Sequence, residues 1–82
     1  MNQQEVHTRV VDILRPFVKN PAALDALTPR TSLLGDLQIN SARMVDIVLE
    51  MEDAFGIAVK DEDADRVETV EDAVSLVLRL KS

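Results

Sequence analysis

Apolar residues recur at helical spacing in three stretches of the chain, and the first stretch covers residues 3–18. There the apolar positions fall three or four residues apart, at Val6, Val10, Ile13, Leu14 and Phe17, which predicts a helix. Pro16 lacks a backbone donor and clashes with the preceding turn, so we expect a kink or an early end of this helix. Residues 19–21 then stop it.

The second stretch, Ser41–Phe55, gives the clearest helix and ends before Gly56, a favoured residue just past a helix. On a helical wheel of about 100° per residue, it carries two apolar stripes. The first contains Met44, Ile47, Val48, Met51 and Phe55 and is expected to face the core. The second contains Ala42, Val45 and Leu49. Because acidic residues flank the second stripe, we expect it to be exposed.

The third helix is expected to begin at Thr69, where Thr69 and Asp72 resemble a capping box. Its predicted buried face is formed by Val70, Ala73, Val74, Val77 and Leu78. The connection over residues 20–40 is long and rich in leucine, so we expect it to pack onto the helices. A helical turn is compatible with residues 22–27 and another with residues 61–66. The pattern predicts an all-α fold of three main helices and one short helix, with no sheet.

Composition excludes several classes of protein. The chain has 82 residues with no Cys, Trp or Tyr, which excludes a disulfide scaffold, a thiolate metal site and a thiol nucleophile. No apolar run approaches the roughly 20 residues of a membrane span, and the N-terminus has no signal-peptide pattern. The net charge is −6, and an acidic chain without basic patches is not expected to bind nucleic acid.

The acidity is concentrated in one block. Residues 46–72 hold eleven acids and two bases, whereas residues 1–45 hold four acids and five bases. One interpretation is a solvated surface that keeps the protein soluble. The other is a docking surface for basic partners, because charge of one sign steers encounter.

No catalytic constellation is visible in the sequence. The one histidine, His7, is expected to be a solvated surface residue. The acids of residues 61–65 lack the central glycine and terminal glutamate of a calcium loop, and we expect no metal site. Ser41, at the start of the second helix, is the one chemically suggestive residue. Either Ser41 or Asn40 is simply the helix N-cap, or Ser41 is modified and holds a phosphoester at the positive end of the helix dipole.

The stretch over residues 32–55, followed by Gly56, Ile57 and Val59, resembles the acyl carrier protein family. The family pattern is a loop ending Asp-Leu-Gly-x-Asp-Ser-Leu and then an acidic helix ending Glu-Glu-x-Phe. The resemblance continues through residues 61–64 and 69–73 and covers nearly the whole chain. It implies one acyl-carrier-like domain over residues 1–82, acting in the cytoplasm as a monomer that is not an enzyme.

The resemblance also implies the chemistry and the site residues. A phosphopantetheinyl transferase is expected to move 4′-phosphopantetheine from coenzyme A onto Ser41, and the thiol of that arm then carries an acyl group as a thioester. Partner enzymes are expected to apply basic patches to the second helix. The implied recognition residues are Asn40, Ala42, Arg43, Val45, Asp46, Leu49, Glu50 and Asp53. The implied acyl-pocket and core residues are Val48, Met51, Phe55, Ile57 and Val59.

Four positions depart from the family pattern. Gln38 stands at the glycine, Asn40 at the aspartate before the serine, Ala42 at the leucine after it, and Arg43 at an acidic position. These changes favour a specialised carrier of lipid or secondary-metabolite synthesis over the housekeeping fatty-acid carrier. Two alternatives stay open: a peptidyl or aminoacyl carrier, and an adaptor that keeps the fold without the phosphopantetheine arm.

Overall fold

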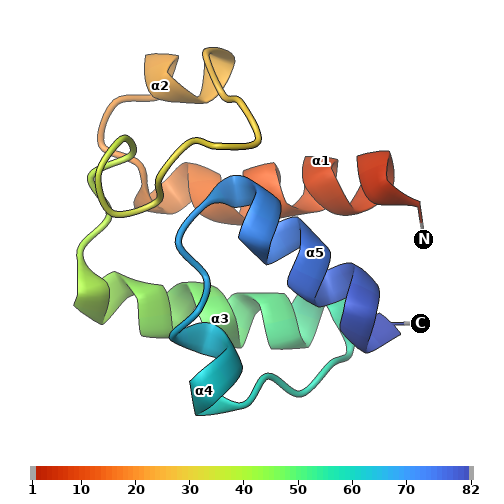
Figure 1. Ribbon diagram of the computed structural model, residues 1–82. Helices are drawn as coiled ribbons and strands as arrows, with labels where there is room; N and C mark the ends of the chain where they lie inside the picture. Colours follow the sequence, from red (N-terminus) through yellow and green to blue (C-terminus); the bar gives the residue numbers. More distant parts are fainter. Residues whose placement is uncertain (1, 82) are drawn as a thin grey trace.

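The computed structural model describes residues 2–81 and confirms the all-α fold (Figure 1). Its three long helices are α1 (Gln3–Leu14), α3 (Ser41–Phe55) and α5 (Val70–Lys81). Three short elements join them: a 3₁₀ helix η1 (Arg15–Phe17), α2 (Ala22–Asp25) and α4 (Asp61–Ala64). The sequence predicted one short helix, and α2 and α4 both form. Within residues 2–81 the nearest feature to a sheet is an isolated bridge between Ser32 and Thr69.

Helix α1 ends earlier than the predicted residue 18. Its α-helical part stops at Leu14, two residues before Pro16, and the chain continues as the 3₁₀ helix η1. The early end follows from Pro16, because it has no N–H to donate to the preceding turn and its ring crowds that turn. Arg15 itself keeps a right-handed helical backbone. At the other end, the Asn2 side chain caps α1 by accepting the Glu5 N–H at 2.8 Å.

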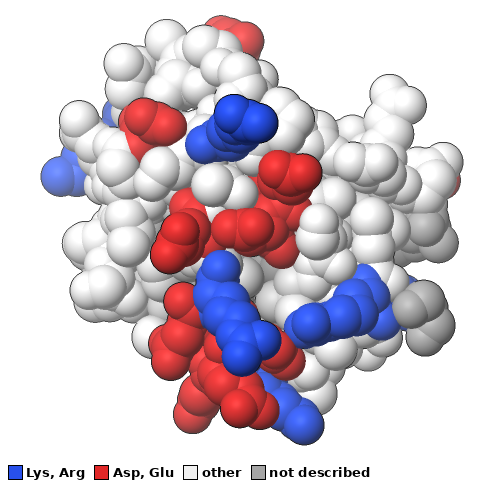
Figure 2. All heavy atoms as spheres, in the orientation of Figure 1, with Lys and Arg blue, Asp and Glu red and all other residues white. Residues whose placement is uncertain are grey.

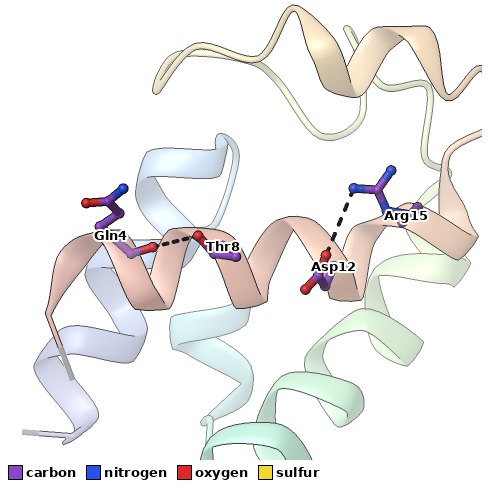
Figure 3. A network of polar contacts seen from close by, with 4 residues as sticks. All are labelled: Gln4, Thr8, Asp12 and Arg15. Atoms are coloured by element: carbon purple, nitrogen blue, oxygen red, sulfur yellow. Dashed lines mark hydrogen bonds and ion pairs between the residues drawn. The ribbon is translucent and has the colours of Figure 1, made fainter.

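One side of α1 is polar, as Figure 3 shows for Gln4, Thr8, Asp12 and Arg15. The Thr8 hydroxyl donates to the Gln4 carbonyl at 3.0 Å, and Arg15 pairs with Asp12 at 3.9 Å. The opposite side packs against α3 and α5 through Val6, Val10 and Leu14, which are fully buried. The helix is therefore amphipathic in the way its sequence spacing predicts.

The long connection over residues 26–40 packs onto the helices, as predicted, and is fixed to the start of α5. The Leu33 N–H donates to the Glu68 carbonyl and the Val70 N–H to the Thr31 carbonyl, both at 3.0 Å. Leu33, Leu37 and Ile39 are buried in the common core. These contacts fix the direction in which the chain enters α3.

Helix α5 starts with the predicted capping box. The Asp72 N–H donates to the Thr69 hydroxyl and the Thr69 N–H donates to the Asp72 carboxylate, both at 3.1 Å. Val70, Ala73, Val74 and Val77 are buried as expected. Leu78 is half-buried and packs against the core. Leu76, which the prediction left out, is buried as well. The buried arc of α5 is wider than a single stripe.

Figure 1 shows α1 and α3 running side by side in opposite directions, with α5 crossing in front of them. Helices α2 and α4 lie at opposite ends of this arrangement, with α4 beside α3. From α3, the core receives Ile47, Met51 and Phe55. Within residues 2–81, no helix has both the length and the apolar character that crossing a bilayer requires.

Candidate functional site

The start of α3 is set by Asn40. Asn40 has the extended backbone of an N-cap, and its side-chain oxygen accepts the Arg43 N–H at 2.9 Å. The helix then runs from Ser41 to Phe55, the predicted bounds, and ends at Gly56 in the left-handed conformation. Of the two candidate caps in the sequence, Asn40 is therefore the one the structure uses.

Ser41 is the first helical residue and is free of any capping role. Its side chain is exposed, and within residues 2–81 its hydroxyl makes no hydrogen bond. The first N–H groups of a helix lack intrahelical partners and give this end a partial positive charge. A phosphoester on Ser41 would therefore lie in a favourable electrostatic environment.

An apolar groove of about 320 Å³ opens beside Ser41, between α3 and the segment that contains α4. Along α3 its lining includes Met44, Val45, Val48, Leu49 and Glu52. The helical wheel assigned the four apolar residues among them to two separate stripes. The groove lies between these stripes and is lined by residues of both. Ser41, Val48 and Glu52 follow one line along the helix at spacings of seven and four residues, so the groove continues from Ser41.

The predicted acyl-pocket and core residues do not form one pocket. Met51 and Phe55 are buried in the core, and half-buried Ile57 packs against that core. Val48 and Val59 instead line the groove. The sequence interpretation named the five residues as acyl-pocket or core residues, and the structure divides them between the core and the groove.

The second apolar stripe of α3 is exposed, as predicted. Val45 and Leu49 keep 61% and 57% of their surface exposed. The other predicted recognition residues are exposed as well: Asn40, Ala42, Arg43, Asp46, Glu50 and Asp53. The helix therefore presents apolar side chains with acidic neighbours, beginning next to Ser41.

Sequence reasoning missed Leu34, which comes from the long connection and lines the groove opposite α3. Leu34 is 49% exposed, and it shares the groove with Val45 and Leu49. The signal was present, since leucine is unusual in an exposed loop. Its assignment to the groove required the tertiary arrangement.

Arg43 lies in the first turn of this surface and pairs with Asp46 at 3.5 Å. Both side chains are more than half exposed, so the pair contributes little to stability. Its effect is on the local charge, because Arg43 offsets the first acidic residue of the helix.

In the folded protein, the acidic block of residues 46–72 forms a surface that also carries basic side chains. Figure 2 shows acidic side chains gathered over α4 and the start of α5, with basic side chains among them. Arg79 of α5 pairs with Asp63 of α4 at 3.0 Å. Within residues 2–81 there is no group of three or more His, Cys, Asp or Glu side chains suited to holding a metal ion.

Gln38, at the glycine position of the family pattern, has a left-handed backbone with φ of 56°. This conformation costs about 1–2 kcal/mol for a residue with a Cβ. We expect Gln38→Gly to raise the free energy of unfolding by up to about 1 kcal/mol, after the greater unfolded-state entropy of glycine is deducted. Urea denaturation measures this change.

Gly56→Ala is the matched reverse test, because Gly56 has φ of 64° and a Cβ there would meet no atom within 4 Å. We expect a loss of about 1 kcal/mol from backbone strain alone. A stability loss in Gln38→Gly would show that the Gln38 side chain matters more than its backbone conformation.

Comparison with known proteins shows the family of the chain. The phosphopantetheine attachment site family matches residues 8–77. An acyl carrier protein of Lactobacillus acidophilus is 30% identical over 77 residues, covering 94% of each chain. An acyl carrier protein of Rubrobacter xylanophilus is 40% identical over 52 residues, covering 63% of this chain and 64% of the relative.

Proteins of this family are carriers rather than catalysts, and they hold a covalently attached 4′-phosphopantetheine group. They work with a transferase that attaches the group and with enzymes that handle acyl groups. The family match spans most of the chain, and the helix order is the one that the family resemblance implied. This chain therefore belongs to the phosphopantetheine-binding family of acyl carrier proteins.

Proposed function

We propose that Ser41 is the attachment site and that the chain carries acyl intermediates as thioesters for a specialised lipid or secondary-metabolite synthesis. The observation that carries this proposal is the position of Ser41. Its hydroxyl is exposed at the first residue of α3 and makes no hydrogen bond to the described part of the chain, while Asn40 performs the capping. Ser41 is therefore available for modification without loss of the helix start.

The surroundings of Ser41 fit a phosphopantetheine arm. The N-terminal end of α3 favours the phosphodiester charge, and the groove beside Ser41 offers apolar side chains to an attached chain. The arm supplies a thiol that forms thioesters, which this chain, having no cysteine, cannot supply itself. The chain's own residues hold the arm at a defined place and present it to partners.

The recognition surface in this proposal is the exposed stripe of Ala42, Val45 and Leu49, with Asp46, Glu50 and Asp53 beside it. Such a surface suits a partner with an apolar depression surrounded by basic residues. We place the carrier in the cytoplasm, where coenzyme A and the transferase are available. Asn40, Ala42 and Arg43 favour a partner set different from that of the housekeeping carrier.

The test of this function is the intact mass of the protein after incubation with coenzyme A and several phosphopantetheinyl transferases. A gain equal to one arm, absent from Ser41→Ala, supports the proposal. No gain with any transferase would favour the adaptor alternative. The acyl or aminoacyl group found on protein purified from its native source then distinguishes an acyl carrier from a peptidyl or aminoacyl carrier.

Arg43→Asp tests whether the local charge selects the transferase. We expect faster loading by a broad-specificity transferase, by about threefold to tenfold, because the change restores an acidic residue beside Ser41 and frees Asp46 from its ion pair. The initial rate of mass gain measures this. Unchanged or slower loading would show that the charge of Arg43 does not limit loading by the transferase. Arg9→Asp on α1 controls for the change in net charge.

A further inference from the structure

The far wall of the groove is a segment with little anchorage in the core. Residues 57–67 contribute Val59, Asp61, Ala64, Asp65 and Val67 to the groove lining. Between Phe55 and Val70 every side chain is exposed or half-buried, and none is fully buried. Helix α4 has only four residues and no side-chain cap. Ile57 and Val67 pack against the core at the two ends of the wall, so contacts other than core packing hold the residues between them against α3.

The Ile57 N–H donates to the Glu52 carbonyl at 3.1 Å where the wall leaves α3. Two contacts made by side chains link the interior of the wall to the long helices. On the α3 side, the Glu52 carboxylate accepts the Val59 N–H at 2.9 Å. On the α5 side, Arg79 pairs with Asp63 at 3.0 Å, and the Asp63 side chain is 17% exposed. Glu52 thus holds the segment that leads into α4, and Arg79 holds α4 itself.

Glu52 is placed where an apolar residue would be expected. It lies in the groove lining, on the line that runs along α3 from Ser41 through Val48, and it is half-buried. Partial burial of a carboxylate costs free energy unless hydrogen bonds compensate it. A charge-assisted bond to a backbone N–H is among the stronger hydrogen bonds in proteins, which gives Glu52 a positional role.

We infer that Glu52 is a positioning residue that sets the width of the groove by fixing Val59, and with it the wall of residues 57–67, against α3. The inference rests on the proposed function only where it assigns the groove to the cargo of Ser41. With the Glu52–Val59 bond made, the wall stays closed over an attached apolar chain. Without the bond, the wall moves away and water reaches the groove.

The first measurement is amide hydrogen exchange on the unmodified protein. Glu52→Met keeps a long helix-compatible side chain but removes the acceptor, and we expect exchange at the Val59 N–H to rise by about tenfold or more. Glu52→Gln keeps an oxygen acceptor and should restore most of the protection. Glu50→Met is the matched control, because Glu50 is exposed on the same helix and holds no backbone group.

The Val59 rate is compared with that of the Met51 N–H in the same sample, since Met51 lies in the buried part of α3. A rise confined to Val59 and its neighbours supports the inference. An unchanged Val59 rate, or an equal rise at both sites, overturns it, because the first shows no tether and the second shows only a loss of global stability.

The second measurement follows the groove itself without requiring a transferase. Ser41→Cys provides a single thiol, since the chain has no cysteine, and an environment-sensitive naphthalene probe is attached to it. We expect blue-shifted emission when Glu52 is present, a red shift with Glu52→Met, and recovery with Glu52→Gln. If the emission wavelength is the same with and without the Glu52 carboxylate, Glu52 does not position the groove wall. This holds even if hydrogen exchange at Val59 changes.

These measurements remain separate from the proposed function. Failure of every transferase to load Ser41 would remove the phosphopantetheine assignment and leave the exchange and probe results unaffected. Normal loading of Ser41 with no effect of Glu52→Met on Val59 or on the probe would leave the carrier function in place and remove the positioning role of Glu52.

Discussion

Ser41→Ala is expected to abolish attachment of the phosphopantetheine arm and to leave the fold unchanged. Loading should fall to background, because no other hydroxyl takes the place of Ser41 at the first residue of α3. Stability should change by only a few tenths of a kcal/mol, since Asn40 and not Ser41 caps the helix. Intact-mass spectrometry measures the first effect and urea denaturation the second.

Two further variants make this result specific. Ser75→Ala removes an exposed hydroxyl from α5 and should load at the normal rate. Asn40→Ala removes the cap and should cost about 1 kcal/mol of stability while keeping the Ser41 hydroxyl. An equal mass gain in Ser41→Ala would place the attachment elsewhere and contradict the assignment of Ser41.

Leu49→Asp should lower the rate of loading or acyl transfer by about fivefold to thirtyfold and leave the melting temperature nearly unchanged. Leu49 is 57% exposed in the middle of the recognition stripe, so it contributes little to the core. Burial of such a side chain in a partner is worth about 1–2 kcal/mol, which corresponds to that loss of kcat/KM. Steady-state kinetics with the transferase and circular dichroism measure the two effects.

The contrasting variant on the same helix is Met51→Asp. Met51 is 3% exposed, and an unpaired carboxylate there should cost about 4 kcal/mol or more, which is a large part of the stability of a domain of this size. Gln3→Glu adds a negative charge on α1 and should alter neither the loading kinetics nor the stability. Normal kinetics in Leu49→Asp would exclude the Val45–Leu49 stripe as the docking surface.

The hydrophobic spacing predicted the long helices closely because each of them buries a continuous stripe. The bounds of α3 and the capping box of α5 were both correct. Local chemistry dictates these features: a left-handed glycine ends α3, and Thr69 and Asp72 satisfy each other's backbone groups. The end of α1 was less accurate, since the sequence located the break at Pro16 but not the change to a 3₁₀ turn.

The groove was not predictable in the same way. It combines side chains from α3, from Leu34 in the long connection and from residues 59–67, and their proximity depends on how these segments pack. A helical wheel describes one helix without the segments that pack against it. It therefore placed Val45 and Leu49 in a different stripe from Met44 and Val48. The bond from Glu52 to Val59 has no signature in the sequence either, because any accessible backbone N–H would serve.

The sequence by itself determined the three long helices, the position of Ser41 at the start of one of them and the exposed stripe with acidic neighbours. These depend on residues close together in the chain, whose periodicity and capping act locally. Only the tertiary structure decided that Asn40 caps α3 and leaves Ser41 free, that Gln38 takes a left-handed backbone, and that a groove opens beside Ser41. The groove depends on how the wall of residues 57–67 packs against α3, and the backbones of Gln38 and Asn40 depend on how the connection over residues 26–40 packs onto the core. Packing between distant segments is set by the whole core rather than by any local pattern.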